Sequence, residues 1–396
     1  MANRTPWLSI IGIGEDGLAG LTDAARAALS QAEIVFGGPR HLALAGAGPK
    51  GRAWPVPFSI TPVLALRGRP TAILASGDPF WHGAGGSIAV HLTQGEWQTF
   101  PAASVFSQTA AHLGWRIEET TCIGLHAAPF ARLLPHLTHD ARLICTLRDG
   151  PAAAQLAAWL TDHGFGASAL TLLESLGGPD QRIRQATAAT FALEARAPVA
   201  IAIHALGPKG LPRAAGLPDD AFAHDGQITK RPIRALTLSA LAPRAGERLW
   251  DLGAGSGSIS VEWCLATPTT TAICVEAKPK RTPNIRANAE TYGLSDRMTV
   301  IEAPALAAIE TLPTPDAVFI GGGADDALLS RLWSLLPQGT RLVVNAVTLD
   351  TESLLVNWSA RHGGTLTRIE IATATPLGTM RGWTPSRAVA QWSVTR

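Results

Sequence analysis

The stretch that most constrains the fold of this chain is residues 248–260, RLWDLGAGSGSIS. Leu249 and Trp250 have the apolar character of a buried strand end, and Asp251 begins a turn. Glycine lets the backbone adopt positive φ or lie against a ligand, because no Cβ stands in the way. We therefore expect a strand, a loop and a helix in succession, with the helix beginning near Ile259 and the loop glycines at Gly253, Gly255 and Gly257.

An acidic residue follows this loop at an informative distance. Glu276 lies 23 residues beyond Gly253 and ends a second strand-like run, 271–275. In a doubly wound sheet, an acid about 20 residues after the first glycine reaches the next strand end and can accept the hydroxyls of a ribose. The pattern predicts a nucleoside site, with a tight turn that binds no ligand as the alternative.

The nucleoside could belong to NAD or to S-adenosylmethionine (SAM). A dinucleotide fingerprint requires G-x-G-x-x-G, whereas residues 253–258 read G-A-G-S-G-S. SAM has no pyrophosphate, so its loop need not direct a helix N-terminus at an anion. The run from Asp251 to Gly257, D-L-G-x-G-x-G, resembles motif I of the Rossmann-like SAM-dependent methyltransferases, and this resemblance implies SAM.

Strand-like and helix-like runs alternate along the chain, which predicts an α/β fold. In the first half we expect strands at 7–13, 34–36, 71–75, 143–147, 170–173 and 199–203, with helices at 21–32, 87–92, 105–113 and 152–163. In the second half we expect a helix at 232–241 and strands near 271–275, 316–320 and 341–345.

The domain boundary is predicted from a change in composition. Residues 206–218 are rich in Gly and Pro and lack apolar periodicity, as in a linker. We therefore predict a first domain at 1–205, with lobes of about 1–98 and 99–205, a linker at 206–221 and a second domain at 222–396.

Charge and cysteine content restrict the class of protein. Charged residues make up 16% of the chain, against about 25% in a typical protein, so we expect apolar surface to be buried in a homo-oligomer. A net charge of +2 argues against a nucleic-acid partner. The four cysteines form no C-x-x-C pair, and no signal peptide or apolar run of about 18 residues is present, so we expect a cytoplasmic protein that does not bind a membrane. The nearest histidine pair, His136 and His139, has one acid beside it and no further cluster, so we expect no metal site.

Residues 5–205 resemble the class III tetrapyrrole methylases of the CbiE type. The matching segments are IGIGEDGLAGLT, LASGDPFWHGAGG, FPAASVFSQTAAHLGW and LLESLGGPDQRI. Residues 222–396 resemble the CbiT-type precorrin methyltransferases in ITKRPIR, WDLGAGSGSISVEW, VEAKPKRTPNIRAN, EAPAL, DAVFIGGG and NAVTLDTE. In this order the two halves resemble the bifunctional CobL-type enzymes of aerobic cobalamin synthesis. The resemblance implies a two-lobed tetrapyrrole methylase domain followed by a Rossmann-like SAM-dependent methyltransferase domain.

The same resemblance implies a reaction. It is the methylation of precorrin-6B at meso carbons 5 and 15 with decarboxylation of the ring C acetate, giving precorrin-8. One methylation would belong to the first half, and the other methylation with the decarboxylation to the second. A methyltransferase acting on RNA or protein, and a non-catalytic protein that binds SAM or a tetrapyrrole, are the alternatives.

Site residues follow from matching positions in the two families. For SAM in the first half they are Ser76, Gly77, Asp78, Ser104, Val105 and Leu147. For SAM in the second half they are Thr229, Gly253, Ala254, Gly255, Ser256, Gly257, Glu276 and Ala303. From the residues alone, Asp78 could instead cap the turn before Pro79, and Thr229 could instead cap the next helix.

A precorrin carries many carboxylates, so cations should line its site. Lys230, Arg231 and Arg234 lie beside the expected SAM site and are the candidate substrate-binding residues, with a solvated helix face as the alternative. Asn345 ends a predicted strand, where such sheets bind ligands, and is the candidate catalytic residue for orienting the ring.

Overall fold

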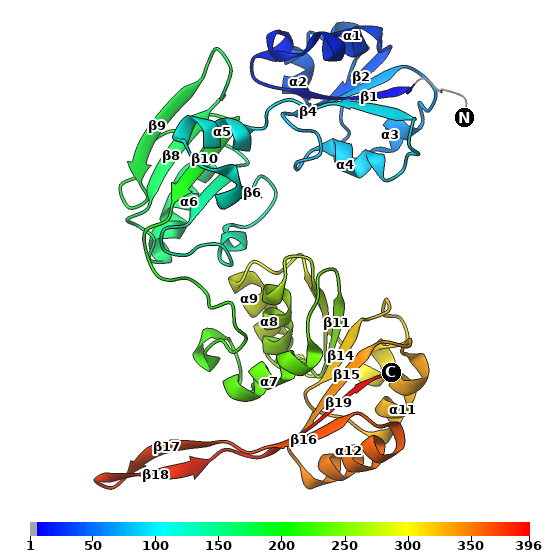
Figure 1. Cartoon of the computed structure of the whole chain (residues 1–396), viewed down its shortest axis with the longest axis vertical. Helices are drawn as coiled ribbons and strands as arrows, with labels where there is room; N and C mark the ends of the chain where they lie inside the picture. The colour runs from blue at the N-terminus through cyan, green and yellow to red at the C-terminus, as the bar shows by residue number, and fades with distance from the viewer. Residues whose placement is uncertain (1–5) are drawn as a thin grey trace. The chain divides into compact units, whose positions relative to one another are not determined.

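The computed structural model describes residues 6–396 and divides the chain into two compact units. The first comprises Met1–Phe130 and His136–Gly210, and the second Ala131–Pro135 and Leu211–Arg396. Figure 1 shows the elements of each unit along the chain. The predicted linker 206–221 therefore divides between the units. Its part from Leu211 onward belongs to the second unit, where Leu217 is buried in the core.

The first unit contains two five-stranded sheets. In the first sheet every strand is parallel to its neighbours, in the order β3-β2-β4-β1-β5. Its strands are β1 Leu8–Ile13, β2 Ile34–Gly37, β3 Gly51–Ala53, β4 Thr71–Ser76 and β5 Trp97–Phe100. Because β5 pairs with β1, the first lobe extends to Phe100 rather than ending near residue 98. The helices of this lobe are α1 Asp23–Gln31, α2 Pro39–Leu44, α3 Thr61–Leu64 and α4 Ala84–Ala89.

The second sheet of this unit is mostly antiparallel, in the order β6-β7-β10-β8-β9. Its strands are β6 Thr121–Gly124, β7 Arg142–Thr146, β8 Ala169–Glu174, β9 Arg182–Thr187 and β10 Val199–His204, with helices α5 Val105–Leu113 and α6 Pro151–Asp162. Ser104 caps α5, because its Oγ accepts the Ser107 amide at 3.1 Å.

The second unit is a three-layer α/β domain around a seven-stranded sheet of order β13-β12-β11-β14-β15-β19-β16. The first five are parallel, and β19 runs antiparallel to both its neighbours. The strands are β11 Arg248–Leu252, β12 Thr271–Glu276, β13 Met298–Glu302, β14 Ala317–Ile320, β15 Arg341–Ala346, β16 Thr365–Ile369 and β19 Val389–Thr395.

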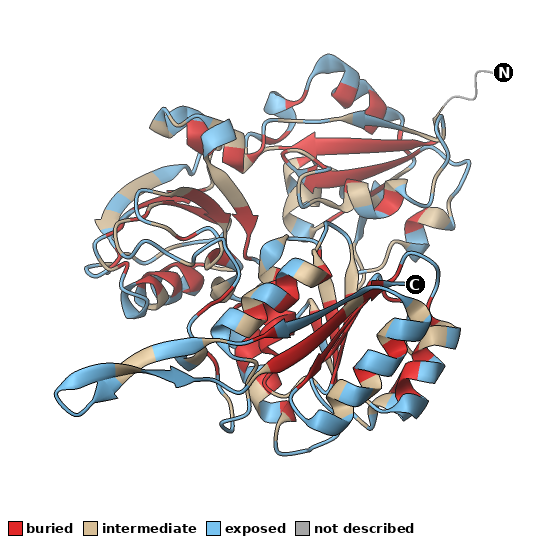
Figure 2. Cartoon of the chain, turned by 60° about the horizontal axis from the view of Figure 1, so that its bottom comes forward, coloured by how far each residue is buried: buried red, intermediate tan, exposed pale blue. Residues whose placement is uncertain are grey.

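Alternating side chains of these strands fill two cores. Leu249 and Phe319 pack with α7 Arg231–Leu241, α8 Ser258–Ala266 and α9 Thr282–Thr291 on one face. Trp250 and Val318 pack with α11 Asp326–Leu335 and α12 Leu349–His362 on the other, near the short α10 Ala305–Ala308. Figure 1 shows these two helix groups on opposite faces of the sheet, and Figure 2 shows the buried strands between them. The predicted Rossmann-like architecture is confirmed.

The strand order places a topological switch point at β11. Its neighbours are β12 on one side and β14 on the other, so the connections on the two sides leave in opposite directions. Ligands of open α/β sheets bind beyond the carboxyl ends of strands at such a point.

A separate hairpin, β17 Ala372–Leu377 and β18 Met380–Pro385, extends away from this sheet. Figure 2 shows it as largely exposed.

Candidate functional site

The glycine loop after β11 has the conformation that only glycine adopts readily. Gly253 and Gly255 have φ values of +73° and +60°. A Cβ at Gly253 would lie 2.7 Å from the Gly322 carbonyl oxygen, whereas a Cβ at Gly255 would meet no heavy atom closer than the Gln227 oxygen at 3.9 Å. Gly253 therefore allows two loops to approach each other, and Gly255 leaves space open beside the backbone.

Glu276 lies beside this loop at the end of β12. Its carboxylate accepts the Gly255 amide at 2.8 Å and the Lys278 amide at 2.9 Å, and the side chain is buried. The Ala303 amide, from the loop after β13, donates to the Glu276 carbonyl oxygen at 3.1 Å. The loops after three neighbouring strands are thus joined by hydrogen bonds.

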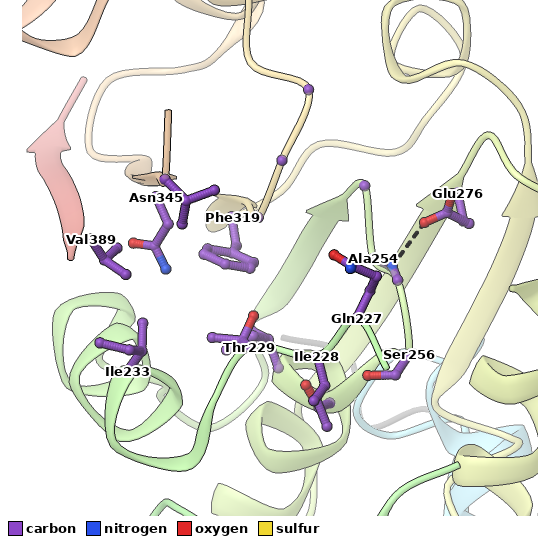
Figure 3. Close-up of a pocket in the computed structure, with 18 of the residues that line it drawn as sticks. Gln227, Ile228, Thr229, Ile233, Ala254, Ser256, Glu276, Phe319, Asn345 and Val389 are labelled. Atoms are coloured by element: carbon purple, nitrogen blue, oxygen red, sulfur yellow. Dashed lines mark hydrogen bonds between the residues drawn. The ribbon is translucent and has the colours of Figure 1, made fainter. Parts of the chain in front are cut away.

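A cavity of about 1080 Å³ opens beyond these strand ends. Typical small-molecule sites enclose about 300–1,000 Å³, so this cavity is large for a single ligand. Of the predicted residues, the structure brings together on its wall Thr229, Lys230, Gly253, Ala254, Gly255, Ser256, Glu276, Ala303 and Asn345. Figure 3 shows Glu276 and Ser256 on one side, with Asn345 and Val389 on the other. Gly257 does not line the cavity and precedes α8 as its N-cap.

Thr229 lines the cavity and does not cap the following helix. Lys230 is the N-cap of α7 and makes no side-chain capping bond. The alternative of Thr229 as an N-cap is therefore wrong. Lys230 also lines the cavity. Among the described residues its only ion pair joins its Nζ to Asp219 Oδ2 at 3.7 Å.

Arg234, predicted to bind substrate, is instead part of the core. Its side chain is fully buried and donates to Glu262 at 2.6 Å and to Asp219 at 3.1 Å, and it packs on the Phe222 ring at 4.7 Å. The Leu217 carbonyl oxygen accepts a further bond. Arg234 therefore fixes the chain that precedes α7, and the prediction of a ligand contact is wrong.

Arg231 is exposed and lies outside the cavity lining. Its amide donates to Asp219, so the structure gives it a place at the start of α7 rather than on the cavity wall.

The sequence interpretation missed other residues of the wall. The cavity wall also contains Gly321, Gly322 and Gly323, which follow β14. Two arginines, Arg281 and Arg387, line the cavity as well. The glycine run after a predicted strand was a usable signal for the first three. Arg387 follows the hairpin, far from the motifs in sequence, and only the fold places it there.

Asp251 lies directly below the glycine loop and is fully buried. Its Oδ2 accepts from the Ser260 hydroxyl at 2.7 Å, and its Oδ1 has no hydrogen-bond partner among residues 6–396. Burial, with a contribution from the Glu276 charge, raises the pKa of Asp251 to about 7.

In the first unit, the loops after β1, β4 and β5 converge. The Gly77 amide donates to the Ile13 carbonyl at 3.1 Å, and the Ala102 amide donates to the Gly77 carbonyl at 3.2 Å. A Cβ at Gly77 would lie 2.7 Å from the Ser104 Cα, so the predicted residues 76–78 and 104–105 lie together. A Cβ at Gly178 would lie 2.6 Å from that of Glu15, which brings the 175–180 turn of the second lobe to the same loops.

The predicted side chains Ser76 and Asp78 already make hydrogen bonds within the first unit. Ser76 Oγ lies 2.8 Å from His41 Nε2 and 3.0 Å from Arg40 Nη2. Burial and the neighbouring Arg40 charge lower the pKa of His41 to about 4, so its imidazole is neutral at neutral pH. Asp78 Oδ1 accepts the Phe80 amide at 2.8 Å, which is the turn-capping alternative. Leu147 follows β7 and is buried, and its amide donates to the Val199 carbonyl oxygen at 3.0 Å.

No group of three or more His, Cys, Asp or Glu side chains in residues 6–396 is arranged to hold a metal ion. Within the same residues, no helix is both long enough and apolar enough to cross a bilayer.

The structure is a two-unit α/β protein whose second unit has a ligand-sized cavity at the switch point of its sheet. The family comparisons place both units among methyltransferase domains. Residues 8–192 match the Tetrapyrrole (Corrin/Porphyrin) Methylases, and residues 220–396 match the Precorrin methyltransferase domain.

Full-length relatives define the family more closely. The chain is 47% identical over 401 residues to a Sinorhizobium protein named precorrin-6Y C(5,15)-methyltransferase [decarboxylating], covering 99% of this chain and 97% of that one. It is 38% identical to the protein of the same name from Mycobacterium tuberculosis H37Rv, covering 98% and 99%. A solved carboxyl-terminal domain of the Rhodobacter capsulatus precorrin-6Y C5,15-methyltransferase is 59% identical over 47% of this chain and all of that one, with a TM-score of 0.46. The chain belongs to the family of decarboxylating precorrin-6Y C(5,15)-methyltransferases.

Proposed function

We propose that this enzyme transfers two methyl groups from SAM to meso carbons 5 and 15 of reduced precorrin-6 and releases the ring C acetate carboxyl as carbon dioxide. The product is precorrin-8, an intermediate of aerobic cobalamin biosynthesis. The relatives' names call the substrate precorrin-6Y, and we use that name and precorrin-6B for the same compound. The observation that carries the proposal for the second unit is its large cavity, which joins a nucleoside-type loop to a wall with cationic side chains.

The residues of the second unit fit SAM. Gly255 leaves open space beside its backbone, and the Glu276 carboxylate stands at the adjoining strand end, where it can accept ribose hydroxyls. SAM would supply a methyl group on a sulfonium, which a carbon nucleophile displaces in line. The chain then has to position the substrate carbon, and positioning of this kind supplies much of the rate of a bimolecular reaction.

The cavity also presents cations for a polycarboxylate. Lys230, Lys278 and Arg387 line it, and the side chains of Lys278 and Arg387 have no ion-pair partner among the described residues. These replace Arg231 and Arg234 as candidates for holding acetate and propionate groups. Decarboxylation requires an electron sink, and the conjugated macrocycle can be that sink without a metal. The task of the chain is to keep water from the carboxylate that leaves.

For the first unit we propose that the converging loops hold a second SAM. Ser76, Gly77, Asp78, Ser104 and Val105 lie together there, which supports a site formed largely by backbone groups. Leu147 remains a prediction from the resemblance alone. We propose that both units bind the precorrin and that the protein is cytoplasmic. We propose no nucleic-acid partner and no membrane partner.

A single-turnover reaction of the full chain with SAM and reduced precorrin-6, read by mass spectrometry, tests the proposal. We expect two methyl additions and the loss of one carbon dioxide. Glu276→Ala should weaken SAM binding in the second unit and abolish the methylation there, while the methylation by the first unit remains. Gly77→Ala, which places a Cβ against Ser104, should remove the other methylation. Retention of both methylations and decarboxylation in Glu276→Ala would contradict the assignment, and binding of SAM without any mass change would contradict the reaction.

A further inference from the structure

Three polar side chains are buried together beside the cavity, and one of them, Asn345, lines it. Thr237 of α7 is fully buried, and Asn345 of β15 and Gln391 of β19 are 7% and 6% exposed. Asn345 and Gln391 face each other in the antiparallel register of β15 and β19. Buried amides and hydroxyls cost free energy unless their hydrogen bonds are made, so the cluster requires an explanation.

The cluster is joined by three hydrogen bonds. Asn345 Nδ2 donates to Thr237 Oγ1 at 3.0 Å, and Gln391 Nε2 donates to Thr237 Oγ1 at 3.1 Å and to Asn345 Oδ1 at 2.9 Å. Both hydrogens of the Gln391 amide and both lone pairs of the Thr237 hydroxyl are therefore used.

Only one orientation of the two amides satisfies all three contacts. If both amides were turned over, Gln391 Oε1 and Asn345 Oδ1 would each need a hydrogen from Thr237, which has one to give. If only one were turned, two donors or two acceptors would face each other. Thr237 and Gln391 thus fix which end of the Asn345 amide is nitrogen.

This orientation leaves a donor at the cavity. Nδ2 carries two hydrogens, Thr237 takes one, and the other has no acceptor among the described residues. Asn345 lines the cavity, so a ligand can supply the missing acceptor. Figure 3 shows Asn345 beside Phe319 and Val389, with Ile233 and Thr229 nearby.

The position of Asn345 selects the kind of ligand. Glu276 ends β12 and Asn345 lies on β15, and β11 and β14 lie between these strands. Three strand spacings of about 4.8 Å separate the two positions by roughly 14 Å. A ribose held by Glu276 is out of reach of Asn345, so the acceptor belongs either to the methionine end of SAM or to the substrate in the rest of the cavity, and the Kd for SAM distinguishes the two.

We propose that Thr237 and Gln391 are positioning residues that hold the Asn345 amide with its nitrogen toward the cavity, where it donates to a carboxylate oxygen of the tetrapyrrole substrate. The proposal rests on the proposed function and names the group in the second unit that fixes the register of the substrate. A carboxylate is the acceptor that a precorrin presents most often, and a fixed donor costs little entropy when it binds one.

The test compares near-isosteric variants of the full chain. Asn345→Asp replaces the donor with a carboxylate, Thr237→Val removes the hydroxyl, and Gln391→Glu replaces the donor that orients Asn345. Thr237→Ser keeps the hydroxyl and is the matched control. For each we would measure the KM for the tetrapyrrole in carbon dioxide release, the Kd for SAM, and the Tm, with methylation by the first unit as an internal standard.

We expect Asn345→Asp to raise the KM about tenfold and Thr237→Val and Gln391→Glu to raise it severalfold, with SAM affinity unchanged and Thr237→Ser close to wild type. A wild-type KM in Asn345→Asp would overturn the proposal. A lowered Tm in Thr237→Val and Gln391→Glu without a change in KM would also overturn it, because that result indicates a purely structural role. A weaker Kd for SAM in these variants, in place of a raised KM, would overturn it as well.

Failure of the proposed function has a different signature. It would show as absence of carbon dioxide release by the wild-type chain. Titration of tryptophan fluorescence with the reduced tetrapyrrole would then compare the same variants by Kd, and an unchanged Kd in Asn345→Asp would overturn the positioning role on its own.

Discussion

At the scale of single residues, burial separates cations that are open to the cavity from cations that hold the fold. Lys230, Arg231 and Arg234 are neighbours in sequence, yet only Lys230 lines the cavity. Arg234 is fully buried where α7 packs against α8, and its guanidinium donates to Glu262 at 2.6 Å, whereas Arg231 is exposed. A motif that gathers cations cannot by itself distinguish these roles.

Replacing Arg234 tests this distinction. Arg234→Ala leaves Glu262 as an unpaired buried charge, which typically costs about 3–5 kcal/mol. We expect a marked fall in the Tm of the second unit, measured by calorimetry. Arg231→Ala, at an exposed position of the same helix, is the control and should leave the Tm nearly unchanged. Equal Tm values for the two variants, with a raised KM in Arg234→Ala, would restore the ligand-binding interpretation.

Asp251 predicts a pH dependence of stability in the second unit. Its pKa in the folded chain is about 7, against about 3.9 in an unfolded chain. Between these values the folded state binds a proton that the unfolded state releases, so stability falls as pH rises from about 4 to 7 and the loss is complete above it.

Asp251→Asn removes this titration. The isosteric amide changes the free energy of unfolding by an amount that does not depend on pH. The free energy of unfolding of the variant, taken relative to wild type, should therefore rise by roughly 2 kcal/mol from pH 5 to pH 7. Hydrogen exchange of the β11 amides at several pH values measures this difference. A difference that stays constant across that range would show that Asp251 is ionised throughout.

At the scale of elements, local patterns predicted the segments and the fold decided their partners. The predicted helix 105–113 is α5 residue for residue, because Ser104 caps it and a left-handed Gly114 ends it. The strand, glycine loop and helix around Gly253 are also confirmed, as is the α/β architecture. These features depend on neighbours within a few residues of each other.

Contacts distant in sequence were not predictable in this way. Asn345 was a candidate from its strand end alone, but the pairing of β15 with β19 is what brings Gln391 to it from 46 residues away. The loop glycines show the same limit. Gly253 and Gly255 read alike in sequence, yet one faces the Gly322 backbone and the other faces open space.

At the scale of the whole molecule, two α/β units each gather loops at the carboxyl ends of parallel strands. In the first unit these loops follow β1, β4 and β5, and in the second they follow β11, β12 and β13. The relatives' name joins two methylations, C(5,15), and under the proposed function each set of loops would serve one of them. The predicted linker is short in the structure, because the chain from Leu211 onward packs into the second unit.

The low charge content still predicts a homo-oligomer, and the hairpin β17–β18 suggests where it forms. Leu377, Met380 and Trp383 are 70%, 75% and 76% exposed on it. A two-stranded hairpin alone is marginally stable in water, so a second copy of this chain would both cover these side chains and stabilise the strands. We expect sedimentation equilibrium at micromolar concentration to show an oligomer, and the triple change of these residues to Ser to yield monomers. Val56→Ser, at an apolar position of the first unit that is 99% exposed, should leave the oligomer intact. A wild-type monomer would contradict self-association, and an unchanged oligomer in the triple variant would exclude the hairpin as its interface.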